Sequence, residues 1–220
     1  MRFDPSVLTQ NAGAILGGFA VTLETWIAGV LIGILAGLVI ALLQLYCGRA
    51  VSGLLRAYIE VVRGTPFLIQ LFFLYYGGPS IGLQLEPITA GILGLGIYGS
   101  AYFAEVFRAG FRSVPRGQLE AGICLCMTRW QMVYRIMLPQ MLVIIVPALS
   151  NTVIVLSKET AVLSMITVPE LTGVLTGIGS SSFAFLEVLV ALCIGYLILV
   201  ELTAYCGRWA ERKVGRFMLR

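Results

Sequence analysis

The longest uncharged run of the sequence, residues 25–48, is the feature that most limits what this chain can fold into. It holds 24 residues without a single Asp, Glu, Lys or Arg. A helix needs about 20 apolar residues to cross the hydrocarbon core of a bilayer, so the run is long enough to span a membrane. The run therefore predicts an integral membrane protein.

The composition of the whole chain supports the same class. Of its 220 residues, 59% are hydrophobic and 12% are charged, about half the charged fraction of a soluble domain. At about 20 residues for each span, this length allows five helices with their loops. We predict an all-α integral membrane fold, with a single transmembrane domain over residues 1–220 and five spans at about residues 14–46, 57–78, 87–110, 138–158 and 183–207.

Two local patterns in the first two spans predict packing and a helix break. Gly29, Gly33 and Gly37 repeat every four residues, which places them on one helix face and lets a second helix approach closely. In the second span, Pro66 frees the carbonyl of Val62, because proline has no N–H to donate. Freed backbone at membrane depth is stable beside protein or a wet cavity. We therefore predict a helix break with a gating role at Arg63, Gly64, Thr65 and Pro66.

Polar residues inside the later spans mark a candidate solute path. Tyr98, Tyr102 and Glu105 lie at i, i+4 and i+7 on an otherwise apolar helix, so they share one face. This stripe fits either a solute path or an aromatic and a charge at the membrane interface. Asn151 and Lys158 share a face of the fourth span. Polar groups there favour pore lining over structural hydrogen bonding, because they are costly in lipid.

The segment 112–139, here called the elbow, is the one long polar interruption in the middle of the chain. Thr128 and Gln131 have the spacing of a capping box, so one short helix is expected to end near Cys126 and a second to begin after Thr128. Pro115 suits a first helical turn, and Pro139 predicts a further break or a new start. The elbow is either a solvated loop or a docking site for a soluble partner.

The basic residues fall on one side of the five predicted spans. Arg49, Arg56, the arginines of the elbow and the tail 208–220 share that side, whereas the other holds Arg2 and, at a span end, Lys158. Lys and Arg are enriched in cytoplasmic loops. We predict an external N-terminus, a cytoplasmic C-terminus and a cytoplasmic helix-turn-helix elbow.

Several function classes find no support in the sequence. The chain has no His, its five Cys form no C-x-x-C pair, and it lacks both a G-x-x-x-x-G-K-[ST] phosphate loop and a G-x-S-x-G nucleophile motif. We expect no metal site, no cofactor bound by this chain and no enzyme activity of its own. Two classes remain open: a membrane subunit of an ATP-driven importer, or a small secondary transporter or channel that works without an ATPase.

Motifs in a fixed order resemble the permease subunits of ABC importers. Glu120–Ala121 and Ile136–Pro139 resemble the EAA loop of that family. Three further stretches resemble its polar amino acid type: residues 63–66 followed by Gln70, residues 102–105 and residues 158–160. The resemblance covers about Thr22 to the C-terminus.

The resemblance implies a Type I importer permease of the bacterial cytoplasmic (inner) membrane. Such a subunit forms the translocation path for a polar or charged amino acid, or a derivative, by alternating access. The implied partners are two cytoplasmic ATPase subunits that use ATP and Mg, a second permease chain (identical or homologous), an extracytoplasmic solute-binding protein and the lipid bilayer, with no nucleic acid. The substrate path is expected to include Gln70, Tyr98, Tyr102, Glu105, Asn151 and Lys158, with Glu105 facing the substrate's ammonium and Asn151 and Lys158 its carboxylate.

The family's coupling loop also departs from its usual pattern at two positions of this chain. Gly122 replaces the second alanine and Cys126 replaces a glycine. Glycine suits a left-handed residue at the end of a short helix, whereas cysteine in that conformation costs roughly 1 kcal/mol or more. The residues implied to couple to the ATPase are Arg116, Gly117, Glu120, Ala121, Gly122, Cys126, Leu138 and Pro139.

Overall fold

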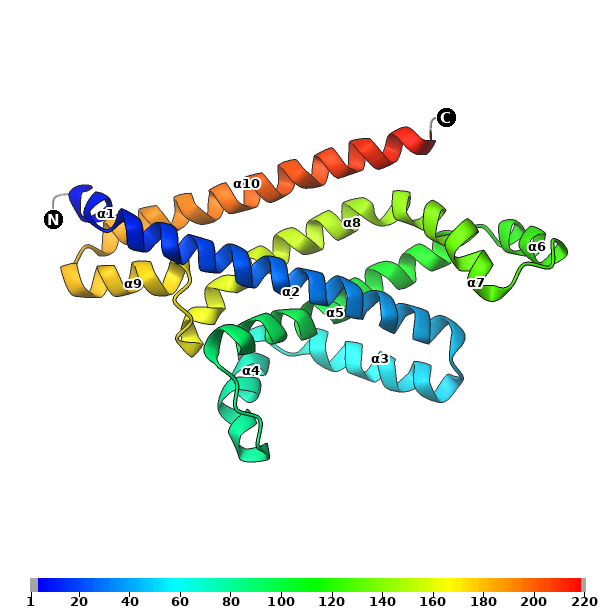
Figure 1. Ribbon diagram of the computed structural model, residues 1–220, viewed down its shortest axis with the longest axis horizontal. Coiled ribbons are helices and arrows are strands. Elements are labelled where there is room, and N and C mark those ends of the chain that lie inside the picture. Colours follow the sequence, from blue (N-terminus) through cyan, green and yellow to red (C-terminus); the bar gives the residue numbers. More distant parts are fainter. Residues whose placement is uncertain (1–3, 219–220) are drawn as a thin grey trace.

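The computed structural model describes residues 4–218 as helices joined by short connections, with no strand among these residues (Figure 1). The α-helices are α1 Ser6–Gln10, α2 Ala12–Tyr46, α3 Arg49–Gly64, α4 Phe67–Phe72, α5 Pro87–Ser113, α6 Arg116–Cys124, α7 Arg129–Met132, α8 Leu138–Glu159, α9 Leu171–Ser182 and α10 Phe185–Met218. Two π-helical turns (Phe73–Gly77, Val133–Met137) and two 3-10 stretches (Gly78–Ile81, Thr160–Ile166) complete them. The side chains of Arg2, Arg216 and Arg220, which the orientation argument counts, lie outside the described part.

Four helical segments are long and apolar enough to cross a membrane: Ala12–Tyr46, Pro87–Ser113, Arg129–Ile166 and Phe185–Val214. A fifth crossing exists if Arg49–Gly64 and Phe67–Ile81, which are bent by 107°, together form one span. Figure 1 shows α2, α5, α8 and α10 running along the long axis of the molecule, while α4 turns away from them. The prediction of an all-helical membrane protein is confirmed, with four or five candidate spans.

The structure corrects the predicted second span, residues 57–78. Its first helix begins at Arg49, inside what was expected to be a link, and the chain turns sharply after Gly64. Arg49, Ser52, Gly53 and Arg56 made its first turns resemble a loop, although the Ala, Leu and Arg residues among them favour a helix. The fifth helix is also longer than predicted, since α10 runs through the basic tail to Met218.

The glycines of α2 form its contact with α5. Gly29, Gly33 and Gly37 are buried, and the Cα of Gly99 on α5 lies 3.3 Å from where a Cβ on Gly33 would stand. A Cβ on Gly37 would lie 2.8 Å from the backbone N of Ala104. The predicted packing face is confirmed, and it joins two helices of the same chain.

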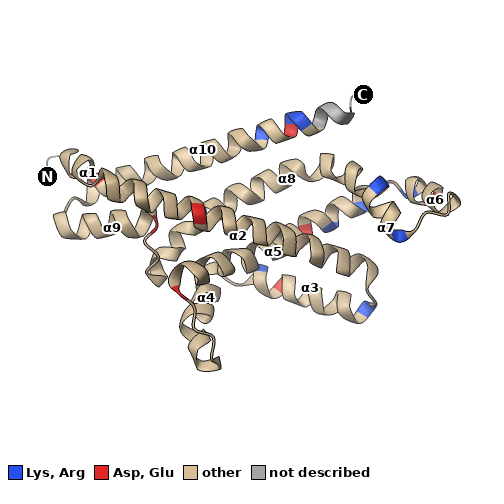
Figure 2. Ribbon diagram, in the orientation of Figure 1, with Lys and Arg blue, Asp and Glu red and all other residues tan. Residues whose placement is uncertain are grey.

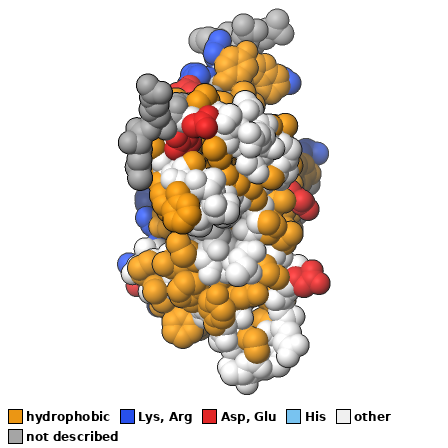
Figure 3. Space-filling view, turned by 90° about the vertical axis from the view of Figure 1, so that its left-hand side faces the viewer, with side chains coloured by type: hydrophobic (Ala, Val, Ile, Leu, Met, Phe, Trp, Pro, Cys, Tyr) orange, Lys and Arg blue, Asp and Glu red, His pale blue; other side chains and the backbone are white. Residues whose placement is uncertain are grey.

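Large hydrophobic side chains remain exposed along the outer helices. Figure 3, viewed from the end that carries α1 and α9, shows hydrophobic side chains over much of the surface. Exposed apolar surface of this extent fits helices in lipid. Examples from α2 and α10 are Leu31, Leu35, Leu189, Leu197 and Leu202.

A buried carboxylate ties α9 to its neighbours. Glu170 is fully buried and caps α9, accepting from the backbone N–H groups of Thr172 and Gly173 at 2.8 Å. The hydroxyl of Tyr196 on α10 donates to the same carboxylate at 3.1 Å, and Thr22 on α2 accepts the N–H of Leu171 at 3.0 Å. Burial raises the pKa of Glu170, and these hydrogen bonds oppose the shift. The network therefore fixes α9 against both α2 and α10.

Replacing Gly37 by alanine tests the α2–α5 contact. The new Cβ meets backbone atoms that cannot rotate away, so we expect a loss of about 1–3 kcal/mol in the free energy of unfolding. The matched control is Gly53→Ala on α3, where a Cβ would have nothing within 4 Å. Thermal unfolding in detergent measures both variants. Equal midpoints for the two would contradict the contact.

Candidate functional site

The helix break between α3 and α4 is the first part of the candidate site. Thr65 and Pro66 have extended backbone, with ψ values of 145° and 139°. The side-chain amide of Gln70 donates to the carbonyl of Val62 at 2.7 Å and to that of Thr65 at 3.0 Å. The carbonyl of Val62, which has no helical donor because Pro66 lacks an N–H, is thus hydrogen-bonded by Gln70. The predicted break is confirmed, whereas its gating role stays a prediction.

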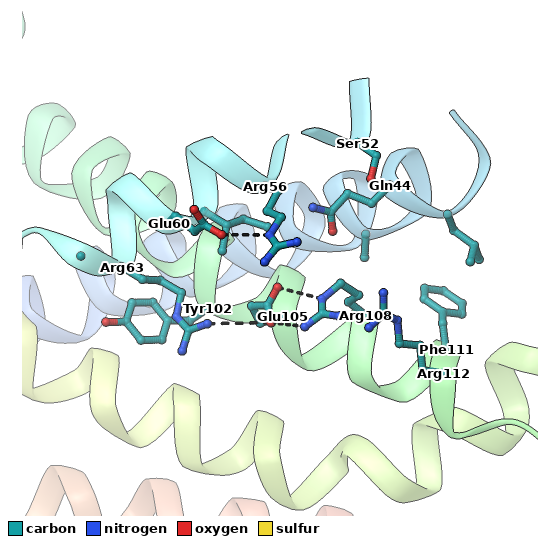
Figure 4. A pocket seen from close by; sticks show the side chains of 14 residues that line it. Gln44, Ser52, Arg56, Glu60, Arg63, Tyr102, Glu105, Arg108, Phe111 and Arg112 are labelled. Carbon is teal, nitrogen blue, oxygen red and sulfur yellow. Dashed lines mark hydrogen bonds and ion pairs between the residues drawn. The ribbon is translucent and has the colours of Figure 1, made fainter. Parts of the chain in front are cut away.

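A cavity of 720 Å³, here called the α3–α5 cavity, opens beside this break between α2, α3 and α5 (Figure 4). Its volume lies in the range of small-molecule pockets, about 300–1,000 Å³. Its polar lining comes from Gln44 on α2, from Ser52, Arg56, Glu60 and Arg63 on α3, and from Tyr102, Glu105, Arg108 and Arg112 on α5.

Ion pairs organise the wall of the cavity. Glu105 accepts from the Nε of Arg108, one turn further along α5, at 2.8 Å. The guanidinium of Arg63 lies 3.9 Å from the same carboxylate and 5.2 Å from the ring centre of Tyr102. The carboxylate of Glu105 is therefore shared by two guanidinium groups. On α3, Arg56 donates to Glu60 at 2.9 Å.

The elbow has the predicted pair of short helices. Thr128 and Gln131 form the capping box: the Thr128 N–H donates to Oε1 of Gln131 at 2.8 Å, and the Gln131 N–H donates to Oγ1 of Thr128 at 3.3 Å. Cys126 is left-handed with φ of 51°, the conformation expected to be costly for cysteine. Pro115 precedes α6 with extended backbone and does not stand in its first turn.

Pro139 stands in the first turn of α8, which begins at Leu138, so the predicted new start is found there and the further break is not. The chain is helical from Arg129 to Ile166, with the π-helical turn Val133–Met137 just before the proline. In a regular α-helix the ring of Pro139 would clash with the carbonyl four residues earlier. A π turn changes that geometry and lets the helix continue.

Apolar side chains of the elbow face outward. Ile123 is 64% exposed, Leu125 76% and Trp130 66%. Glu120 and Ala121 are exposed on the same short helix α6, whereas Gly122 is buried against Met132 and Ile136. An exposed apolar group of this kind at the tip of a projecting segment is typical of an interaction surface.

Comparison with known proteins identifies the family. The family model described as binding-protein-dependent transport system inner membrane component matches residues 29–216. The chain belongs to this family. It is therefore a multi-pass permease of the inner membrane, and the alternative of a transporter or channel outside this family is set aside.

The permease is similar to curated relatives along nearly its whole length. It is 31% identical to the arginine transport system permease protein ArtQ of Bacillus subtilis, over 97% of this chain and 98% of the relative. It is 31% identical to the glutamine transport system permease protein GlnP of Escherichia coli K12, over 97% and 99%. The probable amino-acid permease protein YxeN of B. subtilis is 36% identical over 92% of each chain.

Solved structures share the permease fold. A crystal structure of an amino acid ABC transporter with histidines superposes with a TM-score of 0.88 at 33% identity, over 97% of this chain and 100% of that chain. An inward-facing MetNI methionine ABC transporter has a TM-score of 0.78 at 22% identity, over 93% and 98%. Because the methionine transporter is only 22% identical, its similarity shows the shared fold alone.

The structure brings together four of the residues predicted for the path or the gate: Arg63, Gly64, Tyr102 and Glu105 all line the α3–α5 cavity. Tyr98 is buried beside them, with its hydroxyl 3.0 Å from that of Tyr102. The side chain of Gln70 is hydrogen-bonded to the carbonyls at the helix break and does not line the cavity. Asn151 and Lys158 are exposed on α8 and do not line the cavity.

Sequence reasoning missed several residues of the cavity as site candidates. The spacing of Glu105 and Arg108, at i and i+3, is a signal that could have found that pair. Nothing local marks Gln44, because it stands alone near the end of a long apolar helix. Within residues 4–218, no group of three His, Cys, Asp or Glu side chains could hold a metal ion.

Replacing Gln70 by leucine tests the cap at the break. The change leaves the part-buried carbonyl of Val62 and the exposed carbonyl of Thr65 without their side-chain donor. A fully buried carbonyl without a donor costs about 1–3 kcal/mol, so the loss here should lie toward the lower end of that range. We expect a lower thermal midpoint in detergent for Gln70→Leu. Gln84→Leu, at an exposed position in the next connection, serves as the control, and an equal effect of both would contradict the cap.

Cys126→Gly tests the strain at the turn of the elbow. Glycine removes the clash of a left-handed Cβ, so we expect a gain of about 0.5–1 kcal/mol in unfolding free energy. Cys124→Gly, at the last residue of α6 where the backbone is still right-handed, should instead give no gain, because glycine is a poorer helix former than cysteine. Limited proteolysis of the elbow and thermal unfolding measure the two. A loss for Cys126→Gly would show that the turn is not strained.

Proposed function

We propose that this permease forms the translocation path of an ATP-driven importer for a polar or charged amino acid, or a derivative, by alternating access. Several of its relatives are named as permease proteins of amino acid transport systems, and it superposes closely on an amino acid ABC transporter. The cavity beside a helix break, lined by charged groups, gives such a substrate a polar route past apolar helices.

The charge distribution supports an external N-terminus and a cytoplasmic C-terminus. In Figure 2, Lys and Arg gather at the end of the molecule that carries the elbow and the C-terminus, while several acidic residues lie toward the end with the N-terminus. By the positive-inside rule the elbow end faces the cytoplasm. With this orientation, the proposed partners are a solute-binding protein on the outside and two ATPase subunits, which hold ATP and Mg, on the inside.

The exposed apolar tip of the elbow carries the proposal of ATP coupling. A soluble ATPase can cover Ile123, Leu125 and Trp130, and Glu120 lies on the same helix for a polar contact. The first helix of the elbow, α6, joins α5 through a two-residue connection, Val114–Pro115. A movement of the elbow therefore reaches the helix that carries Tyr102 and Glu105. The ATPase must favour one state of the permease, since a partner with equal affinity for both shifts neither.

A reversed charge at Glu120 tests the coupling role. We expect Glu120→Arg to leave a folded complex in which ATP hydrolysis no longer drives uptake, with transport reduced at least about tenfold, the effect of losing a contact of about 1.4 kcal/mol. Gln118→Arg, an exposed neighbour on α6, is the control. Uptake and ATPase activity are measured together in proteoliposomes. Normal uptake by Glu120→Arg would refute the role.

Co-purification tests the proposal as a whole. The tagged chain is isolated from mild detergent, its partners are identified by mass spectrometry, and ATPase activity is measured. We expect a stoichiometric P-loop ATPase and either one or two kinds of permease chain. A chain that comes alone, without ATPase activity, would contradict the proposed function.

A further inference from the structure

The elbow is attached to α2 as well as to α5 and α8. Its backbone continues from α5 and leads into α8, whereas α2, far earlier in the chain, meets it through side chains. The ring of Tyr46, the last residue of α2, lies 6.2 Å from the ring of Trp130 on α7, centre to centre, with a tilt of 37°. Interacting aromatic rings stand about 4.5–7 Å apart. The hydroxyl of Tyr46 also donates to Sδ of Met137 at 3.9 Å, so Tyr46 contacts the elbow at two residues.

The inner face of the elbow packs on the same end of α2. Val133 and Met137 of the π-helical turn are buried in one hydrophobic cluster with Val114, which lies in the connection between α5 and α6. Leu42 and Tyr46 of α2 pack against this cluster. The inner face of the elbow therefore rests on α2, while its exposed apolar side chains remain free for a partner.

The end of α2 leads directly to the helix that carries the break. The chain turns back after α2, and the two residues Cys47–Gly48 join it to α3 (Figure 1). At its far end α3 reaches the break, where Arg63 contacts Glu105 at 3.9 Å. The buried residues of α3 are Ile59 and Val62, so little packing holds this helix in place. A movement of the end of α2 is therefore passed to α3 over a short connection.

We infer that Tyr46 is a positioning residue for ATP coupling, which passes the movement of the elbow from Trp130 to α2 and α3. The inference rests on the proposed function, in which an ATPase docks on the elbow. Trp130 is 66% exposed, so a partner can cover one part of its ring while Tyr46 contacts another. The route through α5 moves one wall of the α3–α5 cavity, and the route through Tyr46 moves the other.

The amount of solute taken up for each ATP hydrolysed tests this role. The complete complex is placed in proteoliposomes with its solute-binding protein, and the probe is a mixture of radiolabelled common L-amino acids. We expect Tyr46→Ala to keep the ATPase bound and active and to lower the ratio of uptake to hydrolysis about threefold to tenfold, as for the loss of one aromatic pair. A loss of stability alone would lower uptake and hydrolysis together and leave their ratio unchanged.

Further variants separate the ring contact from other effects. Tyr46→Phe keeps the ring and loses the hydroxyl, so its ratio should match that of the natural chain. Tyr46→Ala and Trp130→Ala should not add, because two residues that act through one contact are coupled in a double-mutant cycle. Tyr205→Ala removes an exposed tyrosine of α10 and is the matched control. If Tyr46→Ala does not assemble, Tyr46→Leu, which keeps an apolar side chain at the end of α2, takes its place with the same expected fall.

Several outcomes would overturn the inference. They are a ratio for Tyr46→Ala equal to that of Tyr205→Ala, a Tyr46→Phe variant as impaired as Tyr46→Ala, and simple addition of the two alanine effects. Loss of the ATPase from Tyr46→Ala would assign Tyr46 to assembly and would also overturn it. If Glu120→Arg uncouples hydrolysis from uptake and Tyr46→Ala does not, the inference fails and the proposed function stands. No uptake of any probe by the natural complex would contradict the proposed function itself.

Discussion

The close approach of α2 to α5 is the contact on which the rest of this permease depends. Lipid tails are as apolar as leucine, so helices in a membrane associate through tight packing and not through the hydrophobic effect. Three glycines remove the side chains that would hold the backbones of α2 and α5 apart, and Gly37 leaves no room even for a methyl group. This contact sets α5 in place, and α5 carries the wall of the cavity.

The helix break, the cavity and the elbow follow from where α5 runs. Its polar face meets the end of α3, where Arg63 reaches Glu105. Its last residues lead directly into α6. In the proposed mechanism a push on the elbow therefore moves the ion pairs of the cavity, because one helix connects them. Gln70 keeps the break stable by supplying the hydrogen bond that proline removes.

The elbow contains one well-capped helix start, at Thr128, and one strained backbone position, at Cys126. The capping box of Thr128 and Gln131 satisfies two backbone groups at the start of α7. Cys126 takes a left-handed conformation that glycine would adopt more easily. A π turn accommodates Pro139 within a continuous helix. The predicted turn and capping box were correct because their chemistry is local, whereas the choice between a break and a new start at Pro139 depended on the helix before it.

The sequence by itself determined the membrane class, the glycine face, the break at Pro66 and the capping box, because each depends on neighbours within one turn or on the length of an apolar run. The tertiary structure decided which charges meet. It paired Glu105 with Arg63 from another helix and brought the side chain of Gln70 into hydrogen-bond contact with the carbonyl of Val62. It also placed Gln44, whose Oε1 is buried, in the same cavity wall as four arginines. Helical periodicity gives the face on which a side chain lies, but the partner of that face is set by how the helices pack.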